Sequence, residues 1–122
     1  MEMTHLTENI IYNELVARGY NVDIGIVELN GKNEAGKSTR RQLEVDFIAT
    51  LGSRRYYIQS AYSMPDAQKI EQEKRSFKAI GDMFARVIIT REAVKAHFDN
   101  DGIYILPLKQ FLLNAGTLEI IA

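Results

Sequence analysis

The residues with the clearest chemical potential are two carboxylates, Glu44 and Asp46, which stand two positions apart in an alternating run. Successive side chains on a β-strand face opposite sides of the sheet, so these carboxylates are predicted to share one face. Two adjacent carboxylates need a reason to coexist, and a functional role of this face would be one. The same acids could instead form ion pairs on a solvated face with arginines at positions 40, 54 and 55. Both interpretations stay open at this point.

A β-hairpin is the element that would position this face. Two strand-like runs are separated by a Gly-Ser pair at residues 52–53, and a two-residue loop there fixes the pairing register. Counting outward from the turn sets Asp46 opposite Gln59, and Glu44 then falls opposite Ala61. All four side chains would lie on one face of the hairpin. The opposite face would carry the apolar residues of the first run, which are Leu43, Val45 and Phe47.

A third carboxylate, Glu8, lies on an amphipathic helix predicted over residues 4–18 and ended by Gly19. Glu8 stands at the margin of the apolar stripe, so its side chain could point toward a sheet. A carboxylate early in a helix is also favoured by the helix dipole alone. The stripe itself consists of Leu6, Ile10, Ile11 and Leu15.

Residues 31–38, GKNEAGKS, match the P-loop pattern G-x-x-x-x-G-K-[ST] and come directly after a strand predicted over residues 20–29. A P-loop needs a helix that begins at its Lys-Ser pair, because amide groups at that helix terminus bind phosphate. The chain continues instead with Arg40, Arg41 and the alternating strand. We therefore expect no nucleotide at this stretch, and we interpret residues 30–41 as a polar connection within a hairpin.

The second half of the chain predicts further helices and strands. A Ser-Met-Pro-Asp start signal opens a helix over residues 63–82, with Lys74 on the same side as its apolar stripe. The remaining predicted elements are a buried strand at 86–90, a short helix at 91–98, a strand at 103–106 and a terminal helix at 107–114. The fold class is therefore α/β, in the order α-β-β-β-α-β and then β-α.

The composition narrows the classes of function. A chain of 122 residues predicts one domain, and the absence of cysteine excludes disulfides, thiol catalysis and cysteine-based zinc sites. The net charge of −1 gives no overall basic field, so a nucleic-acid contact needs a local patch. No apolar run reaches the roughly 20 residues of a membrane helix, and we expect a cytoplasmic protein with no membrane partner. A helix so close to Met1 suggests a piece of a longer chain.

Such a basic patch is available near the two predicted turns. If the turns lie together, their cations form one basic edge for the phosphate backbone of DNA or RNA. The residues concerned are Lys32, Lys37, Arg40, Arg41, Arg54 and Arg55.

The order of elements, with carboxylates on the central hairpin, resembles the core of the PD-(D/E)XK nuclease-like superfamily, which has a restriction-endonuclease-like fold. More closely, the chain resembles the C-terminal domain of unknown function in archaeal and bacterial predicted AAA-type ATPases. The resemblance covers nearly the whole chain and implies a central mixed β-sheet flanked by helices, in one domain over residues 1–122, with the ATPase module upstream. The segments that carry it are THLTENIIYNELVARGY, RRQLEVDFIA, RRYYIQSAYSMP, EQEKRSF, RVIIT and DGIYILPLKQFLLN.

The resemblance also implies catalytic roles. In nuclease-like proteins, acids on the first helix and second strand hold Mg²⁺, and an E-x-K element on the third strand adds an acid and a lysine that orients water. Glu8 and Asp46 match the two acids, with Glu44 beside them as a further metal ligand. The E-x-K positions carry Gln59 and Ala61, so the anion and the lysine are both missing. Loss of one electrostatic stabiliser typically costs ~10²–10³ in rate, which argues for weakened hydrolysis.

We therefore expect a degenerate nuclease-like domain that binds a substrate or partner for an upstream ATPase, with nucleic acid as a candidate and without efficient hydrolysis. One alternative is an active Mg²⁺-dependent nuclease in which Lys74 supplies the displaced cation. Another is a domain that only binds protein. The sequence predicts no oligomeric state.

Overall fold

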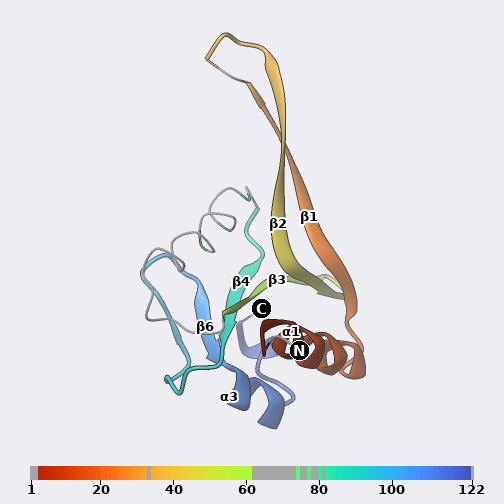
Figure 1. Cartoon of the computed structure of the whole chain (residues 1–122), viewed down its shortest axis with the longest axis vertical. Helices are drawn as coiled ribbons and strands as arrows, with labels where there is room; N and C mark the ends of the chain where they lie inside the picture. Colours follow the sequence, from red (N-terminus) through yellow and green to blue (C-terminus); the bar gives the residue numbers. More distant parts are fainter. Residues whose placement is uncertain are drawn as a thin grey trace.

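The computed structural model describes residues 3–32, 34–61, 74, 77, 80 and 82–121. Its elements form a mixed α/β architecture with one six-stranded sheet (Figure 1). The helices whose bounds lie within the described residues are α1 (Met3–Ala17), α3 (Leu108–Leu113) and a 3₁₀ turn at Glu119–Ile121. The strands are β1 (Asn21–Lys32), β2 (Ser38–Leu51), β3 (Arg54–Ala61), β4 (Ala85–Thr90), β5 (His97–Phe98) and β6 (Tyr104–Pro107).

The sheet has the strand order β1-β2-β3-β4-β6-β5. Strands β3, β4 and β6 are parallel to one another, while β1, β2 and β5 join by antiparallel pairing. The central strand β4 is buried from Val87 to Thr90, as its continuous apolar run predicted. The mixed sheet expected from the sequence is thus confirmed.

Apolar side chains cover the sheet on both faces. One cluster joins α1 to the sheet and includes Ile11, Leu15 and Ile58. The other cluster lies on the opposite face and includes Tyr57 and Phe77. The two clusters flank the sheet and fix which face each strand residue presents.

Helix α1 confirms the prediction for residues 4–18. Gly19 comes after it with a φ of 93°, the left-handed conformation that commonly ends helices. The terminal helix is also confirmed, because Pro107 stands at the N-cap of α3. Most of the helix predicted at 63–82 lies outside the described residues. Within it, Lys74 and Phe77 are helical. None of the described helices is long and apolar enough to cross a membrane.

The short helix predicted at residues 91–98 is wrong. The chain instead forms β5, which pairs with β6 around a turn. Three contacts favour this arrangement over helix propensity. The Asp99 carboxylate accepts hydrogen bonds from the N–H groups of Asp101 and Ile103, at 2.8 and 3.0 Å, and the centres of the Phe98 and Tyr104 rings lie 4.9 Å apart.

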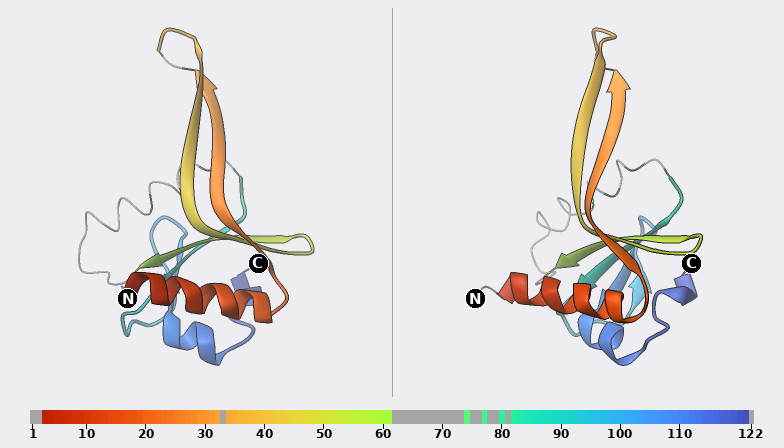
Figure 2. Two further views of the ribbon diagram at one scale, coloured as in Figure 1. Left: turned by 45° about the vertical axis from the view of Figure 1, so that its right-hand side comes forward. Right: turned by 90° about the vertical axis from the view of Figure 1, so that its right-hand side faces the viewer.

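Strands β1 and β2 extend far beyond the rest of the sheet (Figures 1 and 2). β3 pairs with β2 only from Phe47 to Leu51, whereas β1 pairs with β2 as far as Lys32 and Ser38. We call this projection, formed by residues 25–32 and 38–45 of the two strands and by residues 34–37 of their turn, the arm. The polar connection predicted at residues 30–41 is therefore shorter, because an exposed ribbon can keep pairing through polar residues.

Candidate functional site

A β-bulge marks the root of the arm. Ile48 of β2 pairs with Asp23 of β1, and Val45 pairs with Gly25, so Asp46 and Phe47 together stand opposite the single residue between them on β1. A bulge bends a strand and strengthens its twist. Figure 2 shows β2 turning from the sheet into the arm in this region.

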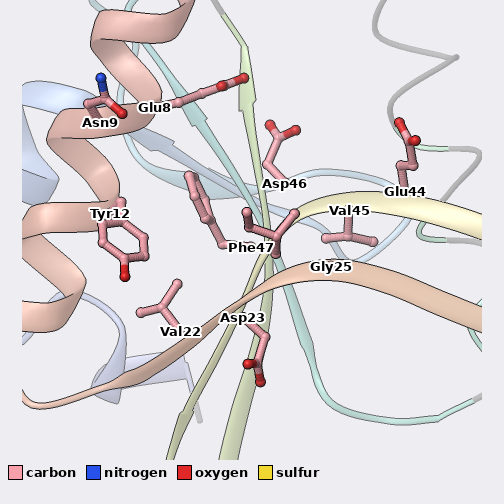
Figure 3. Close-up of a pocket in the computed structure, with 11 residues that line it drawn as sticks. Glu8, Asn9, Tyr12, Val22, Asp23, Gly25, Glu44, Val45, Asp46 and Phe47 are labelled. Carbon is pink, nitrogen blue, oxygen red and sulfur yellow. The ribbon is translucent and has the colours of Figure 1, made fainter.

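The bulge changes which face each side chain takes. Phe47 packs in the cluster with α1, whereas Val45 packs with Tyr57 and Ala61 on the opposite face. The expectation that Val45 and Phe47 share a face is therefore wrong. Glu44 and Asp46 do lie on one side of β2, toward the cleft that Glu8 of α1 also lines (Figure 3). The expected four-residue face does not form, because Ala61 packs with Val45 on the opposite face.

Asp46 and Gln59 still meet, as the predicted register required. That register is confirmed by the pairing of Leu51 with Arg54. Beyond the last paired residues of β2 and β3, side-chain hydrogen bonds to the main chain take the place of main-chain pairing. Gln59 Oε1 accepts a hydrogen bond from the Asp46 N–H at 2.8 Å, and Asp46 Oδ2 accepts one from the Ser60 N–H at 2.8 Å. We call this reciprocal pair of hydrogen bonds the clasp, because it joins β2 and β3 where they diverge.

Asp46 in the clasp and Glu8 on α1 both lie in an environment that disfavours the charged form of their carboxyl groups. Burial raises the pKa of Asp46, the hydrogen bond from Ser60 opposes this shift, and the charge of Glu44 adds to it. Burial also raises the pKa of Glu8, the charge of Asp46 adds to the shift, and His5 opposes it. The two acids therefore interact across the space between α1 and the root of the arm.

A cleft of about 760 Å³ opens beside them (Figure 3). Four carboxylates line it, from Glu8, Asp23, Glu44 and Asp46, together with the rings of Tyr12 and Phe47. No lysine or arginine lines the cleft among the residues whose side chains are described. The electrostatic potential in the cleft is therefore negative.

The predicted metal ligands do not form a ready metal site. Within the described residues, no three acidic or histidine side chains come together in a group that could hold a metal ion. The Gln59 oxygen and one Asp46 oxygen are already hydrogen-bonded to main-chain N–H groups. Each of these bonds occupies an oxygen that Mg²⁺ would otherwise use, an ion that proteins usually hold through one or two carboxylates together with waters.

Lys74, the residue suggested as a displaced catalytic lysine, is engaged elsewhere. Its Nζ lies 2.8 Å from Asp99 Oδ2 and 3.4 Å from Asp101 Oδ2, in the turn between β5 and β6. The hydrogen bond to Asp99 is the main cause of its raised pKa. Its charge therefore stabilises that turn, and the structure gives no contact between Lys74 and the clasp.

The six basic residues do not form one edge. Four belong to the distal part of the arm, whereas Arg54 and Arg55 come after the Gly52 turn at the other end of β2 (Figure 2). Consecutive turns of an antiparallel meander lie at opposite ends of the strand they share, which explains the separation. The guanidinium of Arg55 instead lies 5.4 Å from the centre of the Phe84 ring.

The P-loop-like stretch lies at the end of the arm. Ser38 is the first residue of β2 and pairs with Lys32, so a strand begins where a P-loop needs a helix. Gly36, with a φ of 78°, belongs to the turn. The hairpin interpretation of this stretch is confirmed.

Comparison with known proteins identifies a family. The profile of a domain of unknown function, DUF4143, matches residues 3–111. The chain belongs to the DUF4143 family. An uncharacterized protein of Haemophilus influenzae is 30% identical over 106 residues, which cover 87% of this chain and 22% of that protein. The DUF4143 chain thus spans about a fifth of the length of this relative, and no solved structure matches it.

Some residues that build the DUF4143 site were not foreseen. Ser60 contributes its N–H to the clasp, and Asp23 and Tyr12 line the cleft. Gly25 lets the strands approach, because a Cβ there would lie 2.5 Å from the Val45 carbonyl oxygen. A glycine inside a strand pattern is a known signal of a bulge or close approach, so Gly25 could have revealed the bulge.

Proposed function

We propose that this chain is a noncatalytic, nuclease-like binding module of a longer protein. The observation that carries the proposal is the clasp. The groups of Asp46 and Gln59 that correspond to metal ligands in nuclease-like proteins form hydrogen bonds to the main chain of the neighbouring strand. In this proposal, residues of an inherited active site now serve to fix the direction of the arm.

The position of the missing lysine supports the same proposal. Ala61 is 2% exposed and packs in an apolar cluster with Tyr57 and Val45. Lys74 is paired with Asp99. A cation to orient an attacking water is therefore not supplied by either of the two residues considered for that role.

The proposal places the module at the C-terminal end of a predicted AAA-type ATPase, as the sequence resemblance implies. The length of the Haemophilus influenzae relative supports a longer chain, since the region shared with this protein is 22% of it. ATP-driven movement of the upstream part would then act on whatever the module holds. Nucleic acid is the candidate ligand, and a protein ligand is the alternative.

Metal titration tests the noncatalytic part of the proposal. We would titrate Mg²⁺ and Mn²⁺ by calorimetry into the wild type, Asp46→Ala and Glu34→Ala, where Glu34 is an exposed carboxylate in the turn of the arm. The same three proteins would be incubated with single- and double-stranded DNA. We expect no site-specific metal binding and no cleavage by any of them.

Metal binding that disappears in Asp46→Ala but persists in Glu34→Ala, together with cleavage, would overturn the proposal in favour of an active nuclease. Metal binding with the same pattern but without cleavage would leave the module noncatalytic and show that its carboxylates keep a cation site.

A further inference from the structure

The distal part of the arm, residues 29–32 and 34–41, differs in charge from the rest of the molecule. It contains four basic residues, Lys32, Lys37, Arg40 and Arg41, against one acidic residue, Glu34. The whole chain has a net charge of −1, so the remainder is distinctly acidic. Such segregation of charge in one projecting element favours a polyanionic partner for that element.

The strand register gathers these cations at one end. Arg41 stands opposite Leu29, Arg40 opposite Asn30, and Ser38 opposite Lys32. Lys37 lies next to Ser38 in the exposed turn. Four positive charges therefore fall within the last few residue pairs of a ribbon that no other described strand flanks.

The root of the arm has the opposite charge. The cleft there is lined by Glu8, Asp23, Glu44 and Asp46. A phosphate backbone would be repelled from this cleft and attracted to the far end of the arm. The opposite charges at the two ends of the arm therefore favour binding in which the tip contacts the nucleic acid and the clasp lies away from it.

The shape of the arm selects among nucleic acids. Eight residue pairs, from Gly25 with Val45 to Lys32 with Ser38, give a ribbon about 26 Å long. The major groove of B-form DNA, roughly 12 Å wide, admits a two-stranded β-ribbon, whereas the major groove of A-form RNA is too narrow for side chains to read. We infer that the tip of the arm binds double-stranded DNA in the major groove, through phosphate contacts from its four cations.

This inference rests on the proposed binding function and specifies its ligand. It also separates the arm from Arg54 and Arg55, which lie at the other end of β2. Those two arginines provide a matched control, because removing them changes the net charge as much as removing Arg40 and Arg41.

The test is fluorescence anisotropy with a labelled DNA duplex of roughly 20 base pairs, about two helical turns, over a series of salt concentrations. The proteins are the wild type, Lys37→Gln, Arg40→Gln with Arg41→Gln, and Arg54→Gln with Arg55→Gln. Circular dichroism and urea unfolding would verify that each variant folds. Single-stranded DNA and an RNA duplex of the same sequence are the competing ligands.

For the wild type we expect a slope of log affinity against log salt of about −3.6, the value for four neutralised phosphates. The slope should weaken by about 1 in Lys37→Gln and by about 2 in the Arg40/Arg41 variant. The Arg54/Arg55 variant should keep the wild-type slope, and the RNA duplex should bind more weakly than DNA.

Equal losses in the two double-arginine variants would overturn the inference, because bulk charge would then explain the binding. Equal affinity for the RNA duplex or for single strands would overturn the groove geometry. No DNA binding at the lowest salt would reject DNA as the ligand and favour a protein partner. Metal binding and cleavage judge the noncatalytic proposal separately, so failure of one does not imply failure of the other.

Discussion

In the body of the sheet, β2 lies between β1 and β3 and is covered by apolar side chains on both faces, whereas in the arm the same strand pairs with β1 alone. The body is stabilised by burial of large side chains, with Tyr56, Ile58 and Val87 fully buried. An isolated two-stranded ribbon is marginally stable in water, so the arm depends on its root. One strand thus combines a stable scaffold and a projecting element, and the bulge and clasp mark the border.

The largest expected effect comes from the body. Ile58 is fully buried between the sheet and α1, so Ile58→Ala should lower the free energy of unfolding by roughly 2–5 kcal/mol. Glu34→Ala, in the exposed turn of the arm, should change it by less than about 0.5 kcal/mol. Urea unfolding measures both. Similar costs for the two variants would show that the arm contributes to the cooperative core.

The next effect lies at the root of the arm. Gly25→Ala would place a Cβ 2.5 Å from the Val45 carbonyl oxygen, a backbone atom that cannot move without breaking the bulge. We expect a loss of roughly 1–3 kcal/mol in the free energy of unfolding. Ile24→Ala is the control, since Ile24 is 81% exposed and its truncation should cost little. A neutral Gly25→Ala would mean that the two strands do not approach so closely.

From the hydrogen bonds of the clasp, we expect two substitutions of Asp46 to differ in their effect on stability. Asp46→Ala removes the acceptor of the Ser60 N–H and should cost about 1–2 kcal/mol in stability. Asp46→Asn keeps an oxygen that can accept this bond and removes a carboxylate whose pKa is raised by burial, so it should cost less. Chemical denaturation at neutral pH compares them. Equal destabilisation would indicate that the negative charge, not the hydrogen bond, holds the clasp.

The smallest effect concerns pH. Burial and the charge of Asp46 raise the pKa of Glu8 in the folded state above its unfolded value of about 4.3. The stability that this shift gives to the folded protein is fully present below the unfolded pKa, and it is lost as pH rises through the raised pKa. Glu8→Gln should therefore gain stability relative to the wild type as pH rises from about 4 to 7. The gain should stay below about 1 kcal/mol because the side chain is 32% exposed. Parallel pH profiles of the two proteins would contradict this interpretation.

The sequence predicted the body better than the arm, for a physical reason. The buried strand at residues 86–90, helix α1 and the turn at Gly52 correspond to local signals in the sequence, namely a continuous apolar run, apolar residues at helical spacing and a glycine, which adopts a φ of 62° at the turn. Such signals can be read from neighbouring residues, because each of these elements either buries one face or needs a special backbone conformation at one residue. The register between β2 and β3, and so the meeting of Asp46 with Gln59, could be counted from the turn.

The arm and the details of the site depended on information that no local pattern carries. Strict alternation placed Val45 and Phe47 on one face, and a one-residue bulge separated them. Turns near in sequence need not be near in space, and this is why the basic residues are divided between two ends of β2. Lys74 was placed by its helical spacing, but its partner Asp99 comes from a distant turn. Each miss reflects a tertiary contact that overrides a local expectation.

The bulge has one more consequence. Between its two regularly paired segments, β2 contains one residue more than β1, and the pairs on either side stay in phase without it. Deleting that residue would restore continuous pairing but would turn the β2 side chains on one side of the bulge to the opposite face of the sheet. Adding or removing whole residue pairs beyond the bulge, in contrast, leaves the register of the body unchanged. Variation in reach among related chains would require no compensating change in their core.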